Sequence, residues 1–216
     1  MLEAQANLNV AHHFEDAGQQ QEASTLGMWV FIVQEILFFG GLFATYTVYR
    51  TMYPEAFIIG SHHLDITLGT LNTAVLLVSS LTMALAVHSA QVGRRRTLIL
   101  MLVLTLVLGS TFLGIKGVEY SHKFHDHLVP GPHFSSPGPW EKQVELFYSL
   151  YFGLTGLHAL HMVIGAGLLI WLLVGAVRRR YSPSYYNPVE VIGLYWHFVD
   201  IVWIFLFPLL YLLGRH

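Results

Sequence analysis

Apolar residues along this chain gather in five long blocks, which are separated by polar or by glycine- and proline-rich segments. A helix needs about 20 mostly apolar residues to cross the hydrocarbon core of a bilayer. The blocks that meet this requirement span residues 26–49, 68–87, 97–118, 146–177 and 191–213. The pattern therefore predicts an all-α, polytopic membrane protein, built as a bundle of five transmembrane helices.

The five blocks follow one another closely enough to form one unit. We expect a single membrane domain over residues 25–216, preceded by a polar segment over residues 1–24. The fourth block is too long for an upright helix, so we expect that helix to tilt or to project beyond the bilayer. The sequence shows no internal repeat and no second domain.

Two arginine runs predict the orientation in the membrane. Gly93–Arg96 is a very short basic link between the second and third blocks, and Arg178–Arg180 follows the fourth. Successive links alternate sides, so both runs share a side with the N-terminus. Because basic residues are retained in the cytoplasm, we expect a cytoplasmic N-terminus and an external C-terminus. The connection over residues 121–142, rich in proline and glycine, is then external and irregular.

Composition supports lipid as the solvent of this chain. Charged residues make up 11% of it, hydrophobic residues make up 54%, and the mean hydropathy is +0.54. A soluble domain carries about a quarter charged residues. The lack of cysteine excludes disulfides, iron–sulfur clusters and thiolate metal sites. A net charge of −2 argues against nucleic acid as a partner.

Glu35 is an acidic residue in the middle of the first block. It lies about 14 Å along the helix, near the centre of the bilayer. An ionisable group at this depth costs several kcal/mol unless it is protonated, paired or hydrated, and it commonly marks function. Glu35 is therefore either a functional carboxylate or a protonated acid that bonds to a neighbouring helix.

His158 and His161 lie three residues apart in the fourth block, so they occupy neighbouring edges of one helix face. Such a pair could share a small metal ion, but it cannot supply both axial ligands of one haem, because both side chains point to the same side. No Cys, Asp or Glu lies beside them at ligand spacing. We therefore expect hydrogen bonds across helices, with close approach allowed by small residues. The glycines in question are Gly153, Gly156, Gly165 and Gly167.

The fifth block carries His197 and Asp200, which are again three residues apart. They can pair with each other or with another helix, and we expect this pairing to be structural. Trp196 stands where an aromatic anchor at the membrane interface is expected. Together with Arg94 and Arg178 it is a candidate for contact with lipid headgroups.

Lys116 and Glu119 stand at the end of the third block, near the expected external interface, and their spacing predicts an ion pair. The connection that follows carries a cluster of ionisable side chains: His122, His125, Asp126, His127 and His133. Such a cluster could bind a transition metal. Its spacing matches no specific site, so we expect a polar loop that docks on a partner.

Taken together, these segments resemble subunit III of the haem–copper oxidases, the cytochrome c oxidase subunit III family, in its short five-helix form. The resemblance runs over residues 26–214 and rests mainly on His158–Gly165 and Tyr195–Trp203. Weaker matches support it: Glu35 before Phe38-Phe39, Leu71-Asn72-Thr73, Ser79-Ser80 and Glu119-Tyr120.

The resemblance implies an accessory, non-redox subunit of a proton-pumping terminal oxidase in an aerobic respiratory chain. Haem and copper then belong to partner subunits and not to this chain. Such a subunit packs against subunit I, in a complex with subunit II and further oxidase subunits. It binds phospholipid in a cleft between helices and supports the stability and proton uptake of the catalytic subunit. Glu35 matches the family's membrane-embedded carboxylate. The implied location is the plasma membrane, or inner membrane, of a prokaryote.

The chain departs from the longer family members in two respects. It lacks the first two of seven helices, so part of the lipid cleft must come from another subunit or be missing. Lys116 stands where the family pattern has a neutral amide before Glu-Tyr, which leaves the contacts at that corner open. Glu35 favours cytochrome c as the electron donor of the complex. Alternatives are subunit III of a quinol oxidase and a homologue associated with nitric oxide reductase.

Two functions from other classes are alternatives to the one that this resemblance implies. One is a membrane b-type cytochrome with His88, His158 or His197 as ligands, although His88 and His158 lie at different depths, which does not suit one haem. The other is a small transporter with Glu35 as its proton carrier, although the repeats and broken helices typical of transporters are missing. No signature of an enzyme that is catalytic alone is present.

Overall fold

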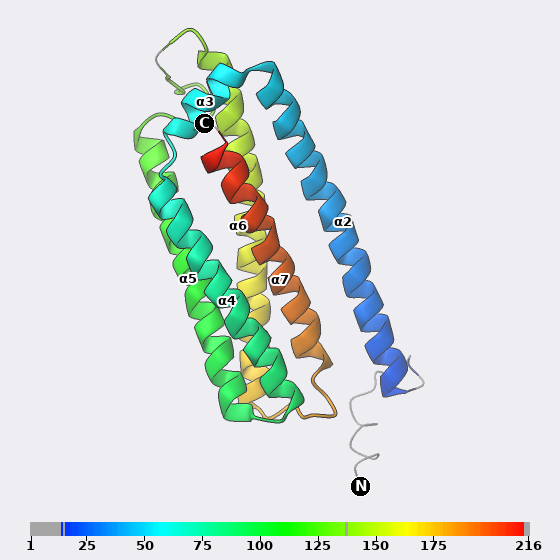
Figure 1. The fold of residues 1–216 in the computed structure, drawn as a ribbon. Helices are drawn as coiled ribbons and strands as arrows, with labels where there is room; N and C mark the ends of the chain where they lie inside the picture. Colours follow the sequence, from blue (N-terminus) through cyan, green and yellow to red (C-terminus); the bar gives the residue numbers. More distant parts are fainter. Residues whose placement is uncertain (1–13, 15, 137, 214–216) are drawn as a thin grey trace.

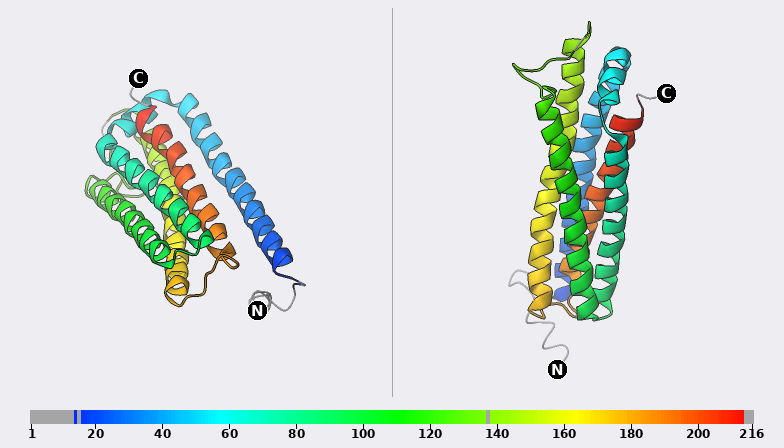
Figure 2. Two further views of the ribbon diagram at one scale, coloured as in Figure 1. Left: turned by 60° about the horizontal axis from the view of Figure 1, so that its bottom comes forward. Right: turned by 90° about the vertical axis from the view of Figure 1, so that its left-hand side faces the viewer.

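The computed structural model of the protein describes residues 14, 16–136 and 138–213. This part contains five helices that are long and apolar enough to cross a membrane. They are α2 (Ala17–Met52), α4 (Ile66–Gln91), α5 (Arg95–His125), α6 (Glu141–Val177) and α7 (Asn187–Phe207). Figures 1 and 2 show them side by side in one elongated bundle. The prediction of an all-α membrane protein with five spanning helices is confirmed.

Both arginine runs lie at the same end of the bundle, which we call the basic end (Figure 1). Gly93 has a left-handed φ of +72°, which glycine adopts without strain, and it reverses the chain between α4 and α5. The Arg95 guanidinium donates to the carbonyl oxygens of Ala176 and Val177, at 2.9 and 2.7 Å. Arg95 thereby ties the start of α5 to the end of α6. Which side of the membrane this end faces stays a prediction, and residues 1–13, 15 and 214–216 lie outside the described part.

Local sequence signals explain where α2 and α4 begin and end. Asp16 caps α2 by accepting a hydrogen bond from the backbone N–H of Gln19, at 2.7 Å. The helix ends before Pro54, which disfavours helical geometry in the preceding residue. Pro54 itself starts a short helix, α3 (Pro54–His62), which the hydropathy pattern did not predict. Asp65 caps α4 by accepting hydrogen bonds from two backbone N–H groups.

All five spanning helices extend beyond the apolar blocks that predict them, and the extensions of α5 and α6 shorten the connection between these two helices. Helix α5 continues through polar residues to His125, and α6 already begins at Glu141. The connection predicted to be irregular over residues 121–142 is thus shorter, and only residues 126–140 lie between the helices. We call the end of the bundle that carries this connection the loop end (Figure 1).

The last span changes its helical form near its end. Pro208 lacks a backbone N–H and cannot continue an α-helix without distortion. The chain there forms a π-helix, η1 (Pro208–Leu212), which continues α7 to the loop end. This turn carries Tyr211, which is fully buried.

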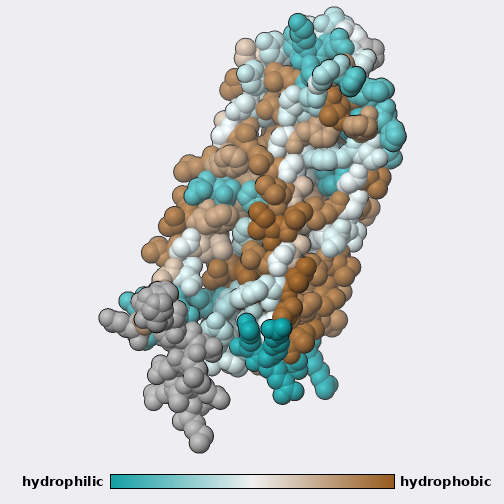
Figure 3. Space-filling model, turned by 180° about the vertical axis from the view of Figure 1, so that it is seen from behind, coloured by the Kyte–Doolittle hydropathy of each residue, from teal (hydrophilic) through white to brown (hydrophobic). Residues whose placement is uncertain are grey.

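The surface matches a protein surrounded by an apolar medium. Figure 3 shows a largely brown, hydrophobic middle with a few teal patches, and most of the teal, hydrophilic groups at the two ends. Many large apolar side chains are exposed in the middle of the helices, such as Leu37, which is 72% exposed. Helix α2 is the least enclosed span, and it diverges from the other helices toward its N-terminal end (Figures 1 and 2).

Close packing at the basic half of the bundle depends on glycine. The ring of Trp196 lies so close to Gly109 of α5 and Gly165 of α6 that an added Cβ would approach it to 2.8 and 2.9 Å. Of the four glycines expected to allow close approach, only Gly165 has this role. Gly153 and Gly167 have nothing within 4 Å of the added Cβ, and Gly156 has only the hydroxyl of Tyr120, at 4.0 Å.

Gly165→Ala is expected to destabilise the bundle by about 1–3 kcal/mol, because its methyl group overpacks the site. That group would lie 2.9 Å from the Trp196 ring. Gly167→Ala is the matched control, since it lies two residues away with free space around it. The measurement is the midpoint of thermal denaturation of this chain after extraction from its membrane. Equal midpoints for the two variants would contradict the packing described here.

Candidate functional site

Glu35 of α2 meets His161 of α6 in the middle of the bundle. The carboxylate atom Oε2 lies 3.3 Å from Nε2 of the imidazole, with side chains 11% and 13% exposed. The contact has the length of an ion pair, but Oε2 has no aligned hydrogen bond. The acid predicted to lie in the membrane is therefore buried and paired with another helix.

Neighbouring side chains hold His161 in place. Its Nδ1 lies 2.8 Å from the carbonyl oxygen of Leu157, one turn earlier on α6. The Tyr195 hydroxyl of α7 donates to the carbonyl oxygen of His161, at 2.9 Å. The ring of Phe39 stands edge-on to the imidazole, with centroids 5.5 Å apart. Three helices, α2, α6 and α7, thus meet around the Glu35–His161 pair.

A second buried polar group lies nearer the loop end, around Lys116 and Glu119. Their ion pair is 3.0 Å long, which confirms the predicted pairing. The pair does not finish a helix at an exposed interface, because both residues are buried within α5. The Lys116 ammonium also donates to the hydroxyls of Tyr151 and Tyr211, at 3.0 and 3.1 Å.

The hydrogen bonds in this second group form a closed network. Tyr151 and Tyr211 both donate to Oε1 of Glu119, at 2.8 and 2.5 Å. All three ammonium protons of Lys116 and both phenol protons therefore have acceptors. The ammonium also lies 5.3 Å from the centre of the Trp203 ring, within range of a cation–π contact. We call these four residues, Lys116, Glu119, Tyr151 and Tyr211, the lysine network.

His158 does not share the surroundings of His161. It is 1% exposed, and its ring lies 5.3 Å from those of Phe112 and Trp203. Neither ring nitrogen has a hydrogen-bond partner among the described residues. The interhelical hydrogen bond expected of this histidine is therefore not formed.

His197 and Asp200 are likewise separated. His197 Nδ1 forms a hydrogen bond with the Ser80 hydroxyl of α4, at 2.7 Å. Of the two expected pairings, His197 therefore forms the one with another helix. Asp200 is 3% exposed, and neither carboxyl oxygen has an aligned hydrogen bond within the described part of the chain, although the Ser80 hydroxyl lies close enough to interact with the carboxyl group. Asn72 is a further buried side chain of this kind.

The candidates for lipid contact have different surroundings. Trp196 is fully buried and donates its indole N–H to the Ser79 hydroxyl, at 3.0 Å, so the expectation of an interfacial anchor is wrong. Its position in sequence suits an interface, but its ring points into the bundle. Arg94 and Arg178 are exposed at the basic end, where headgroups would be within reach.

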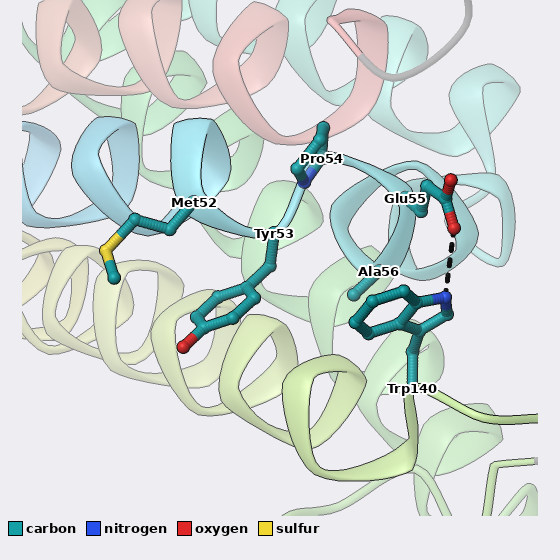
Figure 4. A pocket seen from close by; sticks show the side chains of 6 residues that line it. All are labelled: Met52, Tyr53, Pro54, Glu55, Ala56 and Trp140. Atoms are coloured by element: carbon teal, nitrogen blue, oxygen red, sulfur yellow. Dashed lines mark hydrogen bonds between the residues drawn. The ribbon is translucent and has the colours of Figure 1, made fainter.

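A groove lies at the loop end where α2 passes into α3 (Figure 4). The indole N–H of Trp140 donates to Glu55, at 3.0 Å, and ties the start of α6 to α3. Nearby, the ammonium of Lys123 donates to the carbonyl oxygen of His63 at the end of α3. Nowhere in the described part of the chain do three His, Cys, Asp or Glu residues form a group that could hold a metal ion.

Several of these residues carry no clear signal in the sequence. Tyr151, Tyr195 and Tyr211 are ordinary members of apolar helices, and only the fold brings their hydroxyls to polar partners. Lys123 could have been found, since it follows Lys116 at helical spacing on the same face of α5.

Comparison with known proteins identifies the family. The family model of cytochrome c oxidase subunit III matches residues 6–215. A Bacillus spizizenii protein named quinol oxidase subunit 3 is 32% identical over 189 residues, which cover 88% of this chain and 86% of that protein. A Staphylococcus haemolyticus protein named probable quinol oxidase subunit 3 is 28% identical over 193 residues, or 89% and 90% of the two chains. This chain belongs to the cytochrome c oxidase subunit III family.

Proposed function

We propose that this chain is a non-redox subunit of a haem–copper terminal oxidase that takes its electrons from a quinol. The complex would work in an aerobic respiratory chain in the plasma membrane of a prokaryote. Support comes from the family and from the relatives in Bacillus and Staphylococcus, which are named as quinol oxidase subunits.

The choice of quinol departs from the expectation drawn from Glu35, which favoured cytochrome c. Glu35 lies against His161 inside this chain. That contact joins two helices of one subunit and carries no information about a donor that binds elsewhere in the complex. The names of the relatives therefore weigh more than this residue.

The observation that carries the non-redox role is the packing of His158. Of the three histidines considered as haem ligands, His158 is the one in the core, and the rings of Phe112 and Trp203, each 5.3 Å from it, enclose it. A haem would have to displace both rings from the core. Haem and copper in the proposed complex are held by partner subunits, and this chain serves their stability and proton uptake.

The proposed partners are subunit I, subunit II, further oxidase subunits and membrane phospholipid. The apolar faces of the spanning helices, above all that of α2, offer surface to neighbouring subunits and to acyl chains. Arg94 and Arg178 are exposed at the basic end, and we propose that they bind anionic headgroups there. Glu35 is the proposed buried carboxylate close to proton uptake or to a lipid cleft.

The test is purification of the intact complex through a tag on this chain. We expect haem-bearing subunits to co-purify, and we expect oxygen consumption with a reduced quinol but not with reduced cytochrome c. Activity with cytochrome c alone would overturn the choice of donor and leave the subunit role intact. A Soret band carried by this chain after separation from the other subunits would overturn the non-redox role.

A further inference from the structure

The tautomer of His161 follows from its contact with the backbone. Its Nδ1 lies 2.8 Å from the carbonyl oxygen of Leu157. A carbonyl oxygen can only accept a hydrogen bond, so Nδ1 must carry the proton. In the neutral ring, Nε2 then has a lone pair and acts as an acceptor.

That lone pair faces a second acceptor. Nε2 of His161 lies 3.3 Å from Oε2 of Glu35. An ionised carboxylate is acceptor-only. With Glu35 ionised and His161 neutral, two lone pairs would face each other in an apolar part of the bundle. A buried polar group without a partner is costly there, and an unpaired charge is costlier still.

No other donor relieves this conflict. Among the described residues, no hydrogen-bond donor reaches either carboxyl oxygen of Glu35. The Tyr195 hydroxyl, which contacts the His161 backbone, donates its proton to the carbonyl oxygen of that residue. The remaining close neighbour of the imidazole, Phe39, offers only a ring edge.

We propose that Glu35 and His161 hold one proton between Oε2 and Nε2, as a one-proton site with no net charge. The proton belongs to the pair, whether it sits on the carboxyl or on the imidazole. With no proton the site has charge −1 and two facing acceptors. With two protons it has charge +1 and two facing donors. One proton is the occupancy that gives both atoms a partner.

The chemistry of such a site follows from its geometry. His161 is a positioning residue: the Leu157 carbonyl fixes its tautomer, and so aims a basic nitrogen at Glu35. The site can pass on its proton only when another acceptor reaches it, since the pair has no spare proton. It also ties the least enclosed helix, α2, to α6. The inference goes beyond the proposed function, because it concerns contacts within this chain and holds for either electron donor.

The test counts protons on the two side chains in the purified complex. Solid-state NMR would be recorded with ¹³C-labelled glutamate and ¹⁵N-labelled histidine in this chain. The variants Glu35→Gln and His161→Gln would assign the two sets of signals. Glu35→Gln is isosteric and offers an amide N–H to Nε2, so the contact between α2 and α6 is expected to survive it.

Apart from the proton on Nδ1, we expect one proton on the pair. It would be seen either as a protonated carboxyl beside a neutral imidazole or as a carboxylate beside an imidazolium. A carboxylate beside a neutral imidazole, or a protonated carboxyl beside an imidazolium, would overturn the proposal. Glu55, which accepts from Trp140 at the loop end, is the internal reference for an exposed carboxylate. A neutral imidazole protonated on Nε2 instead of Nδ1 would also overturn it.

Discussion

Lys116→Met is expected to lower the stability of the bundle by about 3–5 kcal/mol, the usual cost of removing one partner of a buried ion pair. The reason lies in the lysine network. Glu119 is 2% exposed and would lose the ammonium 3.0 Å away, leaving one carboxyl oxygen without a donor. The tyrosine hydroxyls that donate to its other oxygen would also lose the ammonium that bonds to them.

The matched control for this prediction is the double variant Lys116→Met/Glu119→Gln. It removes both charges, and neutralising a buried pair as a whole is commonly far less costly than breaking it. The measurement is the thermal dissociation of this chain from the purified complex for the wild type and the three variants of a double-mutant cycle. If the stability loss of the double variant equalled the sum of the losses of the two single variants, the ion pair would contribute nothing as a unit.

The lysine network also settles the corner that the family resemblance left open. A neutral amide at position 116 would need only neutral partners, whereas an ammonium in the membrane needs a counter-charge and acceptors for three protons. Glu119, Tyr151 and Tyr211 provide them. Because these groups come from α5, α6 and η1, the network holds the end of the last span against two other helices.

The five spanning helices could be predicted because membrane spans have a simple signature. A run of apolar residues of the right length must be helical, since lipid offers no partner to free backbone groups. Boundaries were less accurate, because polar residues continue a helix wherever they find partners. Helix α5 runs on to His125, and Lys123 in this extension donates to the end of α3. Helix α3 itself is too short and mixed to stand out.

The candidate site was predictable only in part. Spacing of three residues places two side chains on neighbouring edges of a helix, which was enough for Lys116 and Glu119. It was not enough for His158 and His161, because each edge packs against a different neighbour. His161 turns to Glu35, and His158 turns to Phe112 and Trp203. The identity of the neighbouring helix is tertiary information that spacing along one helix does not contain.

Trp203 is the residue that joins these neighbours in the interior. Its ring centre lies 4.8 Å from that of Phe112 and 5.3 Å from that of His158. The ammonium of Lys116 lies over the Trp203 ring. The indole N–H of Trp203 donates to the Thr73 hydroxyl, at 3.1 Å. The side chain therefore separates the lysine network from the imidazole of His158 and fills the space between α4, α5 and α6.

Trp203→Ala is expected to cost about 3 kcal/mol, because a large cavity forms where the ring was. This is the lower end of the usual range, since lipid is as apolar as the core and adds no driving force of its own. Trp203→Phe keeps most of the ring and loses the bond to Thr73, so we expect a loss of about 1 kcal/mol. Trp171→Ala is the control, since this tryptophan of α6 is 51% exposed on the outer face. The dissociation temperatures of the purified complex rank the stability losses of the three variants. If Trp171→Ala lost as much stability as Trp203→Ala, the effect would depend on ring volume and not on the place of the ring in the core.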